Sequence, residues 1–144
     1  MDTYSPWLAD FHRRLSLHDA GVDALANDIA ARTDWTVHSA AAGDFPAPPE
    51  TIAGAPDVLC TRGELFPLWF EVELPETLVR RETVRRLTRL AANELVEARL
   101  VLVSPAHRHE DHIPEARRML MRAGIAMAVL AIAPEEGMIT DTDW

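Results

Sequence analysis

One feature restricts the fold of this sequence more than any other: an unbroken apolar strand follows directly on a long helical segment. Residues Arg99–Ser104 read Arg-Leu-Val-Leu-Val-Ser, a run typical of strands buried on both faces of a parallel sheet. The preceding segment, Glu76–Ala98, has helical periodicity and itself follows a strand at Phe66–Leu74. A helix between two neighbouring strands requires a parallel crossover, which is right-handed in nearly all proteins. The sequence therefore predicts an α/β fold with a central mixed sheet.

The rest of the chain supplies the other elements of this fold. In chain order, we expect a short amphipathic helix within residues 1–18, a helix over Asp19–Thr33, strands at Trp35–Ala40 and Asp57–Thr61, a helix over Ile113–Ala123 and a strand at Ile125–Ala133. Asp19 is a suitable N-cap for the second helix, Pro114 a suitable first residue for the last one, and Gly124 its terminator. The predicted order is α-β-β-β-α-β-α-β, with helices covering both faces of the sheet.

The length suits one domain with one hydrophobic core. The 144 residues contain 23 acidic side chains against 14 basic ones, all of them arginine, so that the net charge is −9. Because lysine is absent, P-loop phosphate binding and Schiff-base chemistry are excluded. We expect a single domain over residues 1–144, with an N-terminal helical extension at 1–18, a core at 19–133 and an acidic tail at 134–144.

Two features bear on the cellular compartment. The lone cysteine, Cys60, lies in an apolar run, and we expect it to be a buried, unreactive side chain. No signal-peptide pattern is present at the N-terminus, and the longest apolar run, Ile125–Ala133, has about half the length that a membrane helix requires. We therefore expect a soluble, cytoplasmic protein with no membrane partner.

The strongest local pattern is a set of three acidic residues on the predicted central hairpin. Side chains alternate along a strand, so Glu71 and Glu73 project from one face. A turn near Gly63 places Asp57 beside Phe70 or Glu71. Carboxylates at that spacing are the oxygen ligands that Mg²⁺ or Mn²⁺ prefers. The alternative is an ordinary half-solvated strand with alternating glutamates.

Pro56-Asp57, followed after a gap of 13 residues by Glu71-Val72-Glu73, resembles the PD-(D/E)XK motif of the restriction-endonuclease-like superfamily. The predicted α-β-β-β-α-β order of the core is also similar to that superfamily. The resemblance implies a magnesium-dependent nuclease that acts on DNA, in which Asp57 and Glu71 hold the metal and the carbonyl of Val72 is a further ligand. It also implies that some members add an acidic residue from the first helix, for which Asp23 and Asp28 are candidates.

The chain departs from the motif at one position, because Glu73 stands where the family usually has lysine. Some members carry glutamate there and still cleave DNA, so the resemblance leaves Glu73 as a general base or an additional metal ligand. Other members have lost activity and serve as binding or scaffolding modules. The alternative function is therefore a catalytically inactive, dimerising or partner- or nucleic-acid-binding module. The apolar N-terminal extension is consistent with a homodimer.

The arginines are concentrated in one part of the chain. Ten of the 14 lie within residues 80–122, directly after the acidic hairpin. At helical spacing, one face of the helix that follows Glu73 carries four of them, Arg81, Arg85, Arg86 and Arg89. This face is a candidate surface for contacting DNA phosphates. The alternative is a solvated helix face, on which Glu82 pairs with neighbouring arginines.

Three histidines, His107, His109 and His112, lie close together in the segment that follows the buried strand. Their spacing permits a zinc site, although nothing elsewhere in the sequence completes a tetrahedral ligand set. Because neighbouring parallel strands end at the same sheet edge, this segment leaves the sheet beside Leu74. A histidine of this segment could therefore approach the carboxylate site or its substrate.

Overall fold

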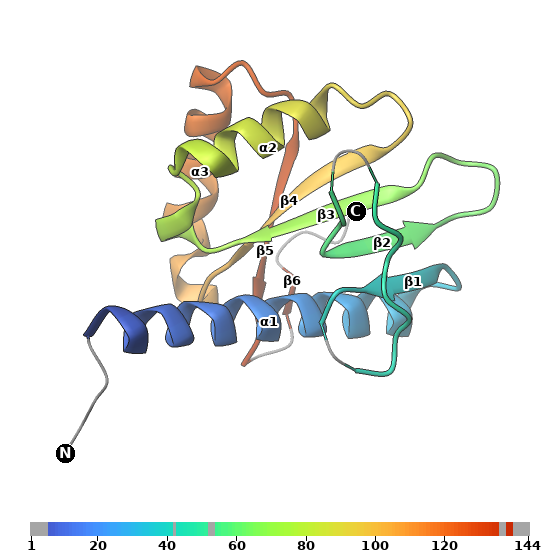
Figure 1. Cartoon of the computed structure of the whole chain (residues 1–144), viewed down its shortest axis with the longest axis horizontal. Helices are drawn as coiled ribbons and strands as arrows, with labels where there is room; N and C mark the ends of the chain where they lie inside the picture. The colour runs from blue at the N-terminus through green and yellow to red at the C-terminus, as the bar shows by residue number, and fades with distance from the viewer. Residues whose placement is uncertain (1–5, 42, 52–53, 136–137, 140–144) are drawn as a thin grey trace.

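The computed structural model describes residues 6–41, 43–51, 54–135 and 138–139, which form one mixed sheet between helices (Figure 1). Within these residues the sheet has six strands in sequential order: β1 Thr36–Ser39, β2 Val58–Thr61, β3 Leu68–Glu73, β4 Glu97–Val103, β5 Ala128–Ala133 and β6 Met138–Ile139. The pairs β1–β2, β2–β3 and β5–β6 are antiparallel, whereas β3–β4 and β4–β5 are parallel. The predicted α/β class and mixed sheet are confirmed.

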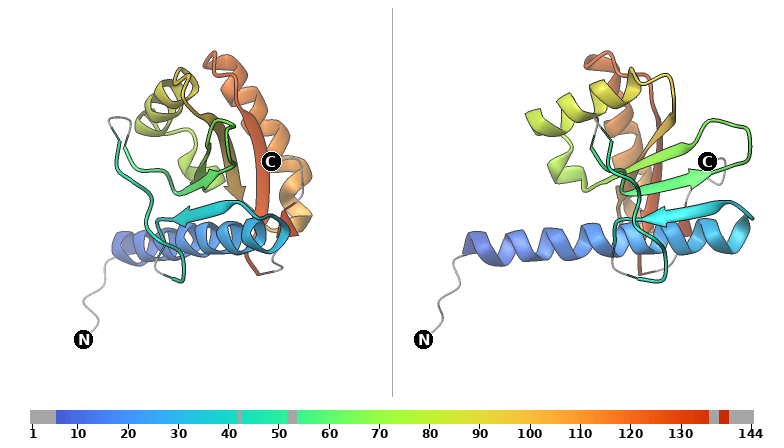
Figure 2. Two further views of the ribbon diagram at one scale, coloured as in Figure 1. Left: turned by 90° about the vertical axis from the view of Figure 1, so that its right-hand side faces the viewer. Right: turned by 45° about the vertical axis from the view of Figure 1, so that its right-hand side comes forward.

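The helices lie on both faces of the sheet, as predicted (Figures 1 and 2). Their bounds are α1 Pro6–Arg32, α2 Arg81–Ala91 and α3 His109–Arg122, with short 3₁₀ turns η1 Pro75–Thr77 and η2 Ala106–Arg108. The second half of α1 packs on one face, and α2 and α3 pack on the other. None of the helices in the described part of the chain is both long and apolar enough to cross a membrane.

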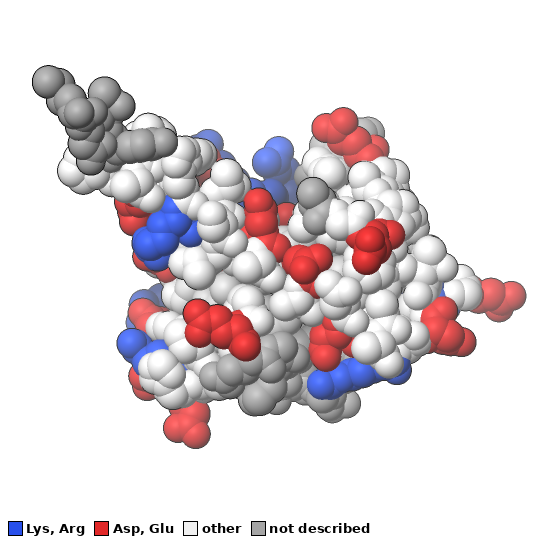
Figure 3. Space-filling model, turned by 90° about the horizontal axis from the view of Figure 1, so that it is seen from below, with Lys and Arg blue, Asp and Glu red and all other residues white. Residues whose placement is uncertain are grey.

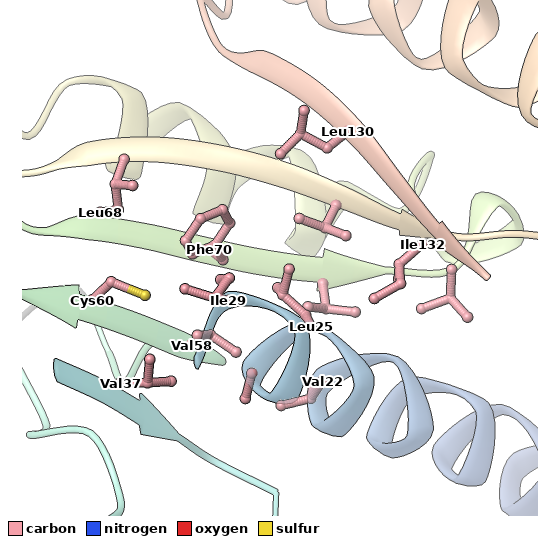
Figure 4. Packing of buried hydrophobic residues seen from close by; sticks show 14 of the residues in the cluster. Val22, Leu25, Ile29, Val37, Val58, Cys60, Leu68, Phe70, Leu130 and Ile132 are labelled. Atoms are coloured by element: carbon pink, nitrogen blue, oxygen red, sulfur yellow. The ribbon is translucent and has the colours of Figure 1, made fainter. Parts of the chain in front are cut away.

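The larger core lies between α1 and the sheet (Figure 4). Leu25 and Ile29 of α1 are fully buried there against Phe70 and Val72 of β3. Cys60 belongs to this cluster, and burial raises the pKa of its thiol to about 12, which confirms the expected unreactive side chain. Strand β4 is apolar on both faces because alternate residues enter the α1 core and a second core under α2 and α3.

The N-terminal third of the chain differs from the prediction of two helices. One helix, α1, runs from Pro6 to Arg32, so Asp19 lies inside it and is not an N-cap. No proline or glycine separates the two predicted segments, and continuing a helix is easier than starting a new one. The first half of α1 extends past the sheet (Figure 1), and Trp7 remains 67% exposed, stacked on Phe11.

The helix predicted over Glu76–Ala98 is shorter than expected. It begins with η1, resumes as α2 and ends at Ala91, so that β4 already starts at Glu97. The side chain of Asn93 accepts a hydrogen bond from the Leu95 amide at 2.9 Å, a local turn that competes with the helix. Apolar periodicity alone did not reveal this stop.

The segment after β4 also differs from the prediction, in which the last helix begins at Ile113. It contains η2 and the first residues of α3, so Pro114 lies inside that helix rather than at its start. Gly124, with φ of 70°, ends the helical region as predicted. In the expected acidic tail, Met138 and Ile139 pair with β5, whereas Trp144 lies outside the described residues.

Gly21 is required where α1 crosses β4. A Cβ atom there would overlap Cγ2 of Val103, whose branched side chain is stiff. Although alanine is the better helix former, we expect Gly21→Ala to lower the free energy of unfolding by about 1–2 kcal/mol. Urea denaturation measures the free energy of unfolding. Adding Val103→Ala to Gly21→Ala should remove the overlap, so that the double variant loses less than the sum of the two single losses. Additive losses in the double variant would contradict this contact.

Candidate active site

Asp57 lies where β2 and β3 separate. The last ladder pair in this direction is Val58 with Phe70, so Asp57 is opposite Glu71, in agreement with the predicted register. The Asp57 side chain accepts a hydrogen bond of 2.8 Å from the backbone N–H of Val72. The carboxylate thus takes the place that a backbone carbonyl of β2 would hold if the strand continued.

Glu71 and Glu73 project from β3 toward α2, on the face opposite Phe70 and Val72. Both are charged side chains at buried positions, with relative exposures of 4% and 7%. Glu71 Oε1 accepts a hydrogen bond from the indole N–H of Trp69 at 2.7 Å, and Glu73 Oε2 accepts one from the Thr77 hydroxyl at 2.8 Å. Neutral donors of this kind orient the carboxyl groups but supply no counter-charge.

Arg86 supplies a counter-charge to both glutamates from α2. Its guanidinium donates a hydrogen bond to Glu73 Oε1, and its Nε lies 3.5 Å from Glu71 Oε2. The sequence placed Arg86 on one face with three other arginines, but the structure separates them. Arg81, Arg85 and Arg89 are exposed, whereas Arg86 is half-buried beside the carboxylates. Arg86 lies three residues after Thr83 and four before Leu90, both buried, and this helical spacing could have indicated that Arg86 lies beside the buried face of α2.

His18 of α1 is the second cationic group, and the sequence did not indicate it. Its Nε2 lies 3.4 Å from Asp57 Oδ2, and its Nδ1 lies 3.4 Å from Asp19 Oδ1. The two acids proposed from this helix do not take that place: Asp28 pairs with Arg32 at 3.3 Å, and Asp23 is exposed. An isolated histidine on a long helix carries no motif by which it could have been found.

The protonation equilibria show how incompletely the site is neutralised. Burial, together with the charge of Asp57, raises the pKa of Glu71 to about 8. Burial also raises the pKa of Glu73, against the opposing effect of Arg86. The hydrogen bond to Asp57 raises the pKa of His18 to about 9. Two cationic groups therefore face three carboxyl groups, and Glu71 retains a proton at neutral pH.

The donor set suits a hard divalent cation. Asp57 and Glu71 offer carboxylate oxygens, and the Val72 carbonyl faces the same side of β3 as the Val72 N–H that Asp57 binds. Burial is the main cause of the raised pKa of Glu71 and the charge of Asp57 is the second, so a cation between the two carboxyl groups would be favourable there. Within the described residues, however, no three His, Cys, Asp or Glu side chains are grouped to hold a metal. Such a site would therefore combine two carboxylates with the backbone carbonyl.

The three histidines do not form the zinc site considered from the sequence. His107 is exposed, and the other two bind the residue at the end of β4. His109 Nε2 lies 2.7 Å from the Ser104 carbonyl oxygen, and His112 Nδ1 lies 2.6 Å from the Ser104 hydroxyl. They join the start of α3 to the sheet.

These pKa shifts predict that stability falls as the pH rises. His18, with an ordinary pKa of 6.5 and a folded pKa of about 9, stabilises the fold fully below 6.5 and loses this contribution through 9. Glu71, with an ordinary pKa of 4.5 and a folded pKa of about 8, acts in the same direction between these values. Urea unfolding between pH 5 and 9 measures the slope. Asp57→Asn should make the dependence of stability on pH less steep, and an unchanged slope would contradict the contacts of Asp57 with His18 and Glu71.

No family model matches the sequence, and no curated protein matches it. The structure is similar to the crystal structure of an XisH family protein from Nostoc punctiforme PCC 73102. The two share 11% sequence identity with a TM-score of 0.52, over 85% of this chain and 97% of that chain. The likeness spans nearly the whole of both proteins, and at this identity it shows a shared α/β fold.

Proposed function

We propose that this chain is a divergent PD-(D/E)XK-like phosphodiesterase that uses Mg²⁺ or Mn²⁺ to hydrolyse DNA. The observation that carries the proposal is the carboxyl pair of half-buried Asp57 and buried Glu71, opposite one another where β2 and β3 separate, with the Glu71 pKa raised to about 8. Buried carboxyl groups that repel one another are unfavourable unless a cation joins them. The motif resemblance and the shared fold support the same function.

Each residue of the site has a distinct task in this proposal. Asp57, Glu71 and the Val72 carbonyl would hold the divalent ion, which when bound activates a water molecule and offsets charge on the phosphodiester. Glu73, held by Thr77, accepts the proton of the attacking water, and its raised pKa makes it a better base. Arg86 supplies the cation that the missing lysine would otherwise provide, since it already lies against both glutamates.

The exposed arginines of α2 are the proposed contacts to DNA phosphates. Arg81, Arg85 and Arg89 follow one another at one-turn intervals on the helix that brings Arg86 to the site. Acidic side chains dominate the face seen in Figure 3, where α1 lies, so we propose that the phosphate backbone follows α2 rather than that face. A duplex or single strand bound along α2 would reach the carboxylates.

The second candidate function is a non-enzymatic binding module, and the position of Arg86 favours it. A guanidinium that binds both glutamates neutralises part of the site without any metal. In that case Trp7, Phe11 and Leu15, exposed on the projecting half of α1, are the proposed surface for a homodimer. Metal binding and cleavage distinguish the two functions.

Calorimetric titration with Mn²⁺ tests the metal site directly. Because Glu71 holds a proton at neutral pH, metal binding at pH 7 should release about one proton, seen as a dependence on the ionisation enthalpy of the buffer. Affinity should rise between pH 6 and 9, and Asp57→Asn and Glu71→Gln should abolish both binding and cleavage of plasmid DNA. Asp28→Asn, which alters an acid paired elsewhere, is the control. No binding at millimolar Mn²⁺ and pH 8.5 would contradict the metal-dependent phosphodiesterase.

The phosphate-contact surface predicts a salt-dependent effect on DNA affinity. The double variant Arg85→Ala, Arg89→Ala should bind DNA more weakly and reduce the slope of log affinity against log salt by about 1.5–2. The matched control is Arg117→Ala with Arg122→Ala on α3. Fluorescence anisotropy at several salt concentrations gives both slopes. Equal slopes for the two double variants would show that α2 is not the contact surface.

A further inference from the structure

A cavity of about 560 Å³ lies at the carboxyl ends of the three parallel strands. Leu74, Val103 and Ala133, from the ends of β3, β4 and β5, form its floor, and Leu17 and Ala20 of α1 form one wall. This volume is in the usual range for small-molecule sites. In α/β sheets the carboxyl ends of parallel strands are also the usual place for a ligand.

The lining combines flat apolar surfaces with a few polar groups. A proline follows the end of each of the three strands, and the rings of Pro75, Pro105 and Pro134 all line the cavity. The polar groups are the hydrogen-bonded pair Ser104 and His112, with the ion pair Arg13–Glu76 and Glu135. Arg13 and Glu76 form an ion pair at 3.0 Å, and the remaining charged residue of the lining, Glu135, is acidic. The cavity therefore disfavours an anionic group and suits an uncharged, flat ligand with a hydrogen-bonding edge.

The cavity begins at the residue after the carboxylate site: Leu74 lines the cavity from the face of Phe70 and Val72, whereas Glu73 projects from the opposite face at the end of β3. Glu73 belongs to the site and Pro75 to the cavity, two residues apart, which corresponds to about 7 Å of extended chain. The helix α1 also borders both places, since Leu17 lines the cavity and its neighbour His18 contacts Asp57 of the carboxylate site. A molecule in the cavity therefore lies within one or two nucleotide steps of a phosphodiester bound at the carboxylates.

We infer that this cavity receives an unstacked nucleobase of the DNA strand whose phosphodiester lies at Asp57 and Glu71, an inference that rests on the proposed function. A nucleobase is flat and uncharged, and its edge carries donors and acceptors that the second ring nitrogen of His112 can meet, since Ser104 holds its Nδ1. Proline and aliphatic side chains make contact with its faces. The consequence is a preference for single-stranded DNA or frayed ends, because a base inside a duplex must first be unstacked.

The test uses the full chain and nucleosides, which lack phosphate and so probe the cavity alone. Titration with adenosine, cytidine, guanosine and thymidine is followed by amide chemical shifts, with saturable shifts expected at Val103, Ser104 and Ala133. Ala20→Phe places an aromatic ring at the mouth of the cavity from an exposed helix position. It should weaken nucleoside binding roughly tenfold or more while leaving Mn²⁺ affinity unchanged. Ala31→Phe, also at an exposed position of α1 but away from the cavity, should change neither.

The outcomes separate this inference from the proposed function. Saturable binding at the cavity that Ala20→Phe weakens, together with faster cleavage of single strands than of blunt duplex, supports the inference. Metal-dependent cleavage without nucleoside shifts at the cavity, or with equal rates on single strands and duplex, overturns it and leaves the phosphodiesterase standing. Nucleoside binding at the cavity without any cleavage overturns the phosphodiesterase and leaves a base-binding site. Equal effects of Ala20→Phe and Ala31→Phe would show that the cavity is not where nucleosides bind.

Discussion

The contacts of the Arg86 guanidinium with Glu71 and Glu73 hold together the carboxyl cluster at the centre of this protein. Glu71 and Glu73, alternate residues on the α2 face of β3, carry buried carboxyl groups, and the carboxyl group of Asp57 lies opposite Glu71. Such a cluster is tolerated in a folded protein only when cations reach it. Arg86 of α2 contacts the glutamates of β3, and His18 of α1 contacts Asp57 before β2, so the carboxyl cluster joins helices that lie on opposite faces of the sheet.

The same incomplete neutralisation links stability to function. Well-packed apolar residues often stabilise a fold as well as or better than a buried charged cluster, and burial here raises the pKa of Glu71 to about 8. A site with too little positive charge is a site that can accept a cation. The parallel crossover adds a second consequence, because it brings the carboxyl ends of three strands, and the cavity that they line, beside that cluster.

Local patterns in the sequence predicted those parts of the structure that depend on neighbours in the chain. Alternation along β3 separated Glu71 and Glu73 from Phe70 and Val72, and the turn placed Asp57 opposite Glu71. The predictions failed where two local tendencies competed. Asp19 is a good cap, yet it lies within a continuous helix, and the apolar spacing that suggested a long helix over 76–98 did not reveal the turn at Asn93.

The order of the elements, the mixed sheet and the gathering of three acidic residues on one hairpin follow from local sequence patterns, because periodicity and turns act over a few residues. Which cations meet these residues depends instead on contacts between distant parts of the chain. Helical spacing grouped Arg86 with exposed arginines, and nothing marked His18, which lies far from Asp57 in the chain. Their positions follow from how α1 and α2 are rotated and placed on the sheet, and this rotation is set by packing of the whole core rather than by adjacent residues.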